Sequence, residues 1–157
     1  DVGTHTHVIQ GNSRYPYHPT TMRLFDFSDT DSTLISLSSI SALGFGVPNL
    51  IAPSQARALN WEAGVTADDT IVRFMGHGIT SAGMAVGAMN NLSAGDKKTA
   101  CKGLAVLHGT VAAMVGHATH AKELKQPVGI ANVVLHSALA VAFVARGFKG
   151  EEDAKVA

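Results

Sequence analysis

Four stretches of the chain contain no Asp, Glu, Lys or Arg, and they set its organisation. They are 19 to 25 residues long and cover residues 32–56, 74–95, 103–121 and 126–145. A helix needs about 20 mostly apolar residues to cross a bilayer, so runs of this length predict four membrane-spanning helices. Because the connectors between the runs are short, consecutive helices are expected to be antiparallel.

Capping residues and prolines predict where the first helices begin and end. Asp29 to Ser32 supply side-chain oxygens that can cap the first helix, and Pro48 is expected to kink or end it. Pro53 is suited to start a short surface helix. Trp61 follows at a position where an amphipathic ring favours a membrane interface.

The later helices carry similar signals. Asp68 precedes the second long helix, and Ser93 precedes a third one that extends to His120. Pro127 suits the first turn of the fourth helix, and Gly147 is placed to end it.

The N-terminal 31 residues differ from the rest of the chain, since they hold two prolines, three histidines and little apolar periodicity. They predict an extended polar arm. The first residue is not methionine, which fits either a processed organellar protein whose targeting peptide has been removed or a sequence that is incomplete at its start. The predicted fold is therefore all-α, with the arm over 1–31, a four-helix transmembrane bundle over 32–147 and a polar tail over 148–157.

Composition supports a membrane class and excludes one group of partners. Charged residues make up 15% of the chain, against about 25% in ordinary soluble domains. The 12 basic and 12 acidic side chains cancel, so no excess of cations is available to bind nucleic acid. The runs are rich in Ala, Gly and Ser, which keeps a soluble four-helix bundle as an alternative, although such a bundle would place charges on its outer helix faces.

The distribution of cations predicts an orientation. With four spans both ends of the chain lie on one side of the membrane, and that side carries eight Lys and Arg against four on the other. The positive-inside rule then places both ends in the cytoplasm, stroma or matrix.

Small residues predict how the helices hold together, because lipid gives no hydrophobic drive for helices to associate. One row lies on the second long helix and another on the third; they are Gly76, Gly83 and Gly87, and Ala105, Gly109 and Ala113. These rows predict that the second and third long helices pack closely.

Histidines within the uncharged runs are the candidate binding residues, since a histidine in lipid needs a partner, a ligand or a watery pocket. His77 and His117 are expected at the same membrane level on antiparallel helices. His108 and His117 are nine residues apart and face opposite sides of their helix. Asn132 and His136 lie one turn apart on one face of the last helix.

Two uses of these residues remain open. Each histidine can be a hydrogen-bonded packing residue. Alternatively, His77, His117, His136 and Asn132 bind a cofactor, with chlorophyll or a carotenoid as the candidate pigment and a haem iron as another candidate for ligation.

The acidic residues argue against catalysis. All twelve lie outside the four uncharged runs, so no buried carboxylate is available for a proton relay or a di-iron site. His77 and Ser81 are one turn apart, but no acid follows to orient the histidine. The sequence therefore predicts a non-enzymatic protein without a metal site built from its own ligands.

The layout resembles small four-helix membrane proteins of the DoxX-like type. The matching features are Gly44-Phe-Gly-Val-Pro-Asn-Leu-Ile-Ala-Pro53 at the end of the first helix, Arg73-Phe-Met-Gly76 at the start of the second, and two further Gly/Ala-rich helices. The likeness covers about residues 32–147, and the polar arm departs from it. It implies a fold and no catalytic residues.

The arm, the processed start and the lack of catalytic groups also look like an accessory subunit of an organellar supercomplex. An algal photosystem with its antenna in the chloroplast thylakoid is the preferred host, and a respiratory complex of the mitochondrial inner membrane is the alternative. The predicted function is to bridge neighbouring membrane subunits. A small membrane redox or transport protein that binds a cofactor between its helices remains the second hypothesis.

Overall fold

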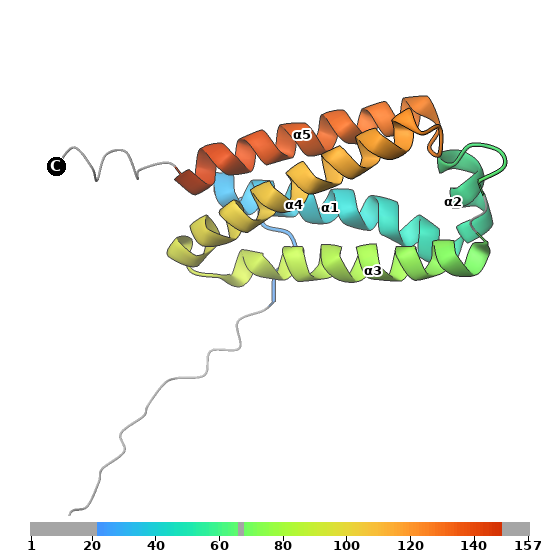
Figure 1. Ribbon diagram of the computed structural model, residues 1–157. Coiled ribbons are helices and arrows are strands. Elements are labelled where there is room, and N and C mark those ends of the chain that lie inside the picture. The colour runs from blue at the N-terminus through green and yellow to red at the C-terminus, as the bar shows by residue number, and fades with distance from the viewer. Residues whose placement is uncertain (1–21, 66–67, 149–157) are drawn as a thin grey trace, which may run out of the picture.

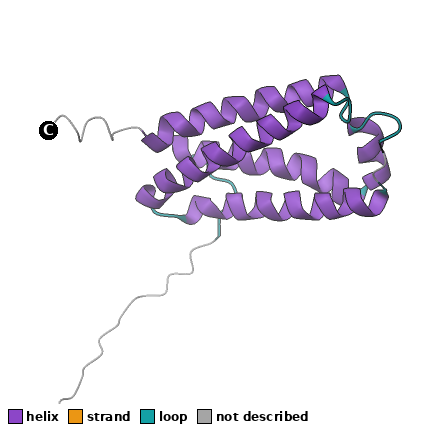
Figure 2. Ribbon diagram, viewed as in Figure 1, coloured by secondary structure: helices purple, strands orange, loops and turns teal. Residues whose placement is uncertain are grey.

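The computed structural model describes residues 22–65 and 68–148, which are predominantly helical (Figures 1 and 2). In chain order the elements are α1 (Thr30–Ile51), α2 (Pro53–Asn60), α3 (Asp69–Ala88), a 3₁₀ turn η1 (Met89–Asn91), α4 (Ala94–His120) and α5 (Gln126–Phe148). The predicted all-α class is confirmed for these residues, in which the one extended pairing is an isolated bridge between Trp61 and Leu124.

Most of the predicted helix starts are confirmed by their caps. The Asp29 carboxylate accepts a hydrogen bond from the Ser32 backbone N–H over 2.8 Å, and Asp68 accepts one from Ile71 over 2.8 Å. Ser93 caps α4 in the same way, and Pro53 occupies the first turn of α2. Pro48 lies inside α1, which continues to Ile51 before it ends.

The four long helices form two closely packed pairs, α1 with α3 and α4 with α5 (Figure 1). Glycines make the first pair possible. A Cβ atom added at Gly76 would lie 2.6 Å from the carbonyl carbon of Asn49, and one added at Gly46 would lie 2.7 Å from the Thr80 backbone nitrogen. Ser39 Oγ also donates a hydrogen bond to the Gly83 carbonyl over 2.8 Å across the same contact.

The predicted close packing of α3 against α4 is therefore wrong. The glycine row of α3 faces α1, where Gly83 lies against Ala42 and Leu43. Gly109 of α4 has no neighbour within 4 Å of a Cβ atom added to it. Glycine spacing identified a contact face on α3 but not the helix that covers it.

The two pairs meet around a small apolar core. Ile35 of α1, Val86 of α3, Leu104 of α4 and Phe143 of α5 contribute one side chain from each long helix, and Cys101 lies beside them with no exposed surface. Much of the remaining interior is polar. The buried polar residues are Ser32, Ser36, Ser38, Ser39, Asn49, Asn90, Lys97 and His108.

Large apolar side chains cover the outside of the same helices. Phe74 is 80% exposed, and Val106 and Val141 are each 70% exposed. Three helices, α1, α4 and α5, are long and apolar enough to cross a membrane. The fourth predicted span forms α3 but falls short of this, because Arg73, His77 and several glycines lower its apolar character.

Charged side chains make contacts at the two ends of the long helices. At one end Arg146 of α5 pairs with Asp31 of α1, and Lys97 of α4 lies 3.6 Å from Asp29. At the other end, beside α2, Lys125 donates a hydrogen bond to the Ala58 carbonyl. Figure 1 shows that α1 begins and α5 ends at the same end of the molecule.

The last part of the predicted arm is attached to the helices. Residues 22–29 are non-helical. The Leu24 carbonyl accepts a hydrogen bond from Asn90 Nδ2 over 3.0 Å, and the Asp26 backbone exchanges two bonds of 2.8 Å with Ser36 Oγ. The rest of the arm and nearly all of the predicted tail lie outside the described residues.

Candidate functional site: a histidine pair between three helices

Two histidine rings and a serine hydroxyl form a continuous polar chain across α1, α4 and α5. Ser38 Oγ lies 2.7 Å from His108 Nε2, and His108 Nδ1 lies 2.7 Å from His136 Nδ1. The two imidazole rings are 4.9 Å apart at their centres and inclined by 27°, so they meet largely edge to edge. His108 is 3% exposed, whereas His136 is partly exposed at the rim of the helices.

Packing fixes the central ring of this chain. The Phe143 ring lies nearly parallel to that of His108, with an interplanar angle of 8° and centres 5.6 Å apart. Phe143 itself has no exposed surface. His108 is therefore held by hydrogen bonds along two edges and by an aromatic ring on one face.

The connection between α4 and α5 explains why the two histidines meet. The chain reverses around Lys122, whose φ of 58° is in the left-handed region and helps to end α4. His108 lies fourteen residues before Lys122 and His136 fourteen residues after it (122 − 108 = 136 − 122 = 14). Antiparallel helices with equal rise place both side chains at one level.

Two proton arrangements satisfy the chain of neutral rings. When Ser38 donates to His108 Nε2, His108 donates through Nδ1, and His136 keeps its own proton on Nε2. When His108 instead donates to Ser38, His136 donates to His108, which leaves the Nε2 lone pair of His136 free. The outer nitrogen of His136 is thus either a donor or a ligand, depending on the orientation of one buried hydroxyl.

A serine that contacts a histidine, which in turn contacts a third side chain, is also the arrangement of a catalytic nucleophile with its general base. Ser38, however, is 2% exposed, so its hydroxyl is shielded by the surrounding helices. A neutral His136 cannot stabilise an imidazolium as a carboxylate does. Nothing in this geometry brings a substrate to Ser38.

The four predicted binding residues are placed as follows. His136 is part of the pair, but its partner is His108, which the sequence did not single out for binding. Asn132 lies one turn away, and its side chain donates a hydrogen bond of 2.9 Å to the Val128 carbonyl of its own helix. His77 and His117 are exposed on α3 and α4, two helices that are not closely packed. The structure does not bring these two together.

Metal-ligating side chains do not gather in the described part of the chain. Over residues 22–65 and 68–148 no three His, Cys, Asp or Glu side chains come close enough to hold an ion. A metal held here would have to bring most of its ligands with it, since protein sites for bare zinc or iron use three or four side chains.

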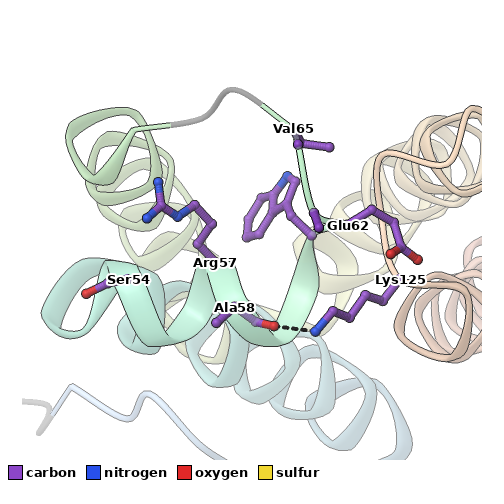
Figure 3. A pocket seen from close by; sticks show the side chains of 9 residues that line it. Ser54, Arg57, Ala58, Glu62, Val65 and Lys125 are labelled. Atoms are coloured by element: carbon purple, nitrogen blue, oxygen red, sulfur yellow. Dashed lines mark hydrogen bonds between the residues drawn. The ribbon is translucent and has the colours of Figure 1, made fainter.

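A second feature is an open pocket of about 470 Å³ between α2 and the α4–α5 turn (Figure 3). Arg57, Trp61 and Lys125 are among its lining residues. Both cations already have partners, because Arg57 lies 3.5 Å from Asp69 and Lys125 binds the Ala58 carbonyl. The pocket therefore lies where α2 is attached to the α4–α5 turn.

Comparisons with protein-family models, with curated proteins and with solved structures find no match to this chain. The resemblance to DoxX-like proteins remains a prediction.

Proposed function

We propose that the protein is a non-catalytic, membrane-embedded subunit that bridges larger membrane proteins. The observation that carries this proposal is the inverted distribution of side chains. Serines, asparagines and a histidine occupy buried positions, while residues such as Phe74, Val106 and Val141 are 70–80% exposed. In water this arrangement would expose large apolar surfaces on every long helix, whereas a bilayer or neighbouring apolar helices would cover them.

The interior supports the same proposal. Backbone contacts through Gly46 and Gly76, and the hydrogen bond from Ser39 to the Gly83 carbonyl, are the means by which helices associate in lipid. A soluble bundle would instead rely on a continuous apolar core, and the core here is confined to a few side chains around Ile35 and Phe143.

The placement of charge fits a bilayer. Among the described residues, the charged side chains of the four long helices lie toward the helix ends, and the deepest is Lys102, the ninth residue of α4. The charge-free parts of these helices are 32–51, 74–88, 103–120 and 126–145. In α1, α4 and α5 this part is 18 to 20 residues long. About 20 helical residues span about 30 Å, which matches a hydrocarbon core. Trp61 and its pocket lie at one boundary of these charge-free parts, where amphipathic rings are favoured.

The host complex is the finer part of the proposal. We favour a photosystem with its antenna in the thylakoid, with a respiratory complex of the mitochondrial inner membrane as the alternative. The reasons are the polar arm and the exposed apolar faces of α4 and α5, which suit contact with neighbouring membrane subunits.

A single fractionation tests both the membrane location and the host complex. Source membranes are first washed with alkaline carbonate and then solubilised in mild detergent, and the chain is followed through a density gradient while absorbance is recorded. Retention after the wash and co-migration with a heavy pigmented band are expected. A heavy colourless band would contradict the photosystem host, and release without detergent would contradict the membrane proposal itself.

A further inference from the structure

The Nε2 atom of His136, at the outer end of the polar chain, has no role in the contacts described above. The Nδ1 atom of this ring is engaged by His108, and the described residues provide no hydrogen-bond partner for its Nε2 atom. His136 is only partly buried, and its Nε2 is not one of the fully buried unpartnered atoms of the described residues, so Nε2 can be reached from outside the helices. At this depth a bilayer has no water to satisfy it.

The surroundings of His136 select an apolar ligand. Six large apolar side chains within one turn of Ser38, His108 or His136 are at least 43% exposed; they are Leu37, Ile40, Val106, Leu107, Val134 and Leu135. A ligand that reaches His136 from outside α5 therefore has the exposed side chains of Val134 and Leu135 within one turn of the imidazole.

We propose that His136 Nε2 is the axial ligand of the metal in a planar tetrapyrrole of the chlorophyll or haem type. This inference rests on the membrane location proposed above. A tetrapyrrole supplies four nitrogen ligands itself, so it requires only one from the protein and matches a site with one available imidazole and no cluster of further ligands in the described residues.

The hydrogen-bonded chain behind His136 is suited to this role. A ligating histidine usually donates its other ring N–H to a second group, which fixes the tautomer and the ring orientation. In the second of the two proton arrangements described above, His136 donates through Nδ1 to His108, and His108 donates through Nε2 to Ser38. The Ser38 hydroxyl then turns toward a carbonyl of its own helix, as helical serines commonly do.

The test uses the full chain purified in mild detergent and titrated separately with chlorophyll a and with haem. Wild-type protein is expected to bind one macrocycle per chain with a shifted absorption band, and the macrocycle that binds identifies the class. His136→Gly should abolish the shifted band, and added imidazole should restore it by occupying the vacated space. Matched variants His117→Gly and His77→Gly, which change exposed histidines, should bind as wild type does.

Three results would overturn the inference: binding of neither macrocycle by wild type, unchanged binding by His136→Gly, or equal loss in His117→Gly. Thermal unfolding of each variant is recorded beside the titration, and imidazole rescue separates ligation from misfolding. Failure of this inference is distinct from failure of the proposed function. A chain that stays in carbonate-washed membranes but binds no macrocycle contradicts only the ligand.

Discussion

Arg146 Nε donates a hydrogen bond to Asp31 Oδ1 over 2.5 Å, which ties the end of α5 to the start of α1. The two residues are 115 positions apart in sequence. The α1–α3 and α4–α5 pairs otherwise share only limited contact around the small core, so this ion pair is one of the few polar links that join them.

Loss of that link should loosen the two pairs. We expect Arg146→Gln to lower the free energy of unfolding by about 1–2 kcal/mol, less than for a fully buried pair because about a third of the Arg146 side chain is exposed. Thermal unfolding in detergent measures the change. The exchanged double variant Asp31→Arg with Arg146→Asp should recover part of the loss, whereas recovery of none would argue against a direct pair.

The close contact of α1 with α3 predicts a strong effect of added bulk. Gly83→Leu should destabilise the protein by about 1–3 kcal/mol or more. A Cβ atom added at Gly83 would lie only 3.1 Å from side-chain atoms of Ala42 and Leu43, and leucine adds further atoms beyond it. Gly109→Leu is the matched control, because open space surrounds that position. Equal melting temperatures for the two variants in detergent would refute the packing of the pairs.

The hydroxyl of Ser38 should matter for the buried histidine. Ser38→Ala removes the hydrogen-bond partner of His108 Nε2, and a buried polar atom without a partner costs about 1–3 kcal/mol. Ser41→Ala is the control, since Ser41 Oγ bonds only to the Ser38 carbonyl of its own helix. Urea unfolding in detergent compares them, and a Ser38 variant as stable as the Ser41 variant would show that the chain adds nothing to stability.

The cap of α1 should respond to acid. The backbone N–H of Ser32 donates to Asp29, and this hydrogen bond lowers the pKa of that carboxyl below its ordinary value. A lowered pKa in the folded state stabilises the fold above the ordinary value of about 4, and the contribution is lost as the pH falls through the lowered pKa. Amide protection factors at Ser32 and Thr33 should therefore fall below about pH 4.

Asp29→Asn provides the control for this acid effect. Asparagine is also a good N-cap but does not titrate, so its protection factors should change less over the same pH range. The same acid-induced loss in both proteins would place the effect at another carboxylate.

The arm should have two parts with different roles. Deletion of residues 1–21 is expected to weaken retention in the host complex and to leave membrane insertion and thermal stability unchanged. Deletion of residues 1–28 should also lower stability, because it removes the bonds of Leu24 to Asn90 and of Asp26 to Ser36. If the shorter deletion leaves retention intact, the arm is not the tether.

Local signals in the sequence were sufficient to predict where the helices begin, but not which helices pack against each other. Asp29, Asp68 and Ser93 predicted the helix starts because a cap depends on residues within one turn. The glycine row of α3 predicted a contact face, but the partner was α1, because spacing along one helix does not say how the other helices are arranged around it.

The site was only half predicted for the same reason. His77 and His117 were paired by membrane level alone, and they lie on helices that do not pack closely. His108 was missed although the signal was present, since it and His136 are equally distant from Lys122 in the α4–α5 turn. Counting from the turn identifies a level on two helices that are certain to be adjacent. The third member, Ser38, depends on α1 and could not be found by counting.

The most direct test is to measure whether lipid or water surrounds the outer surface of the helices. Spin labels on single introduced cysteines at Val106 and Val141 report collisions with oxygen, which concentrates in lipid, and with a water-soluble nickel complex; a label at Asp96 serves as the aqueous reference. The native Cys101 has no exposed surface and should stay unlabelled. In bilayers we predict high oxygen and low nickel accessibility at Val106 and Val141. High nickel accessibility at both positions would contradict the membrane-embedded arrangement.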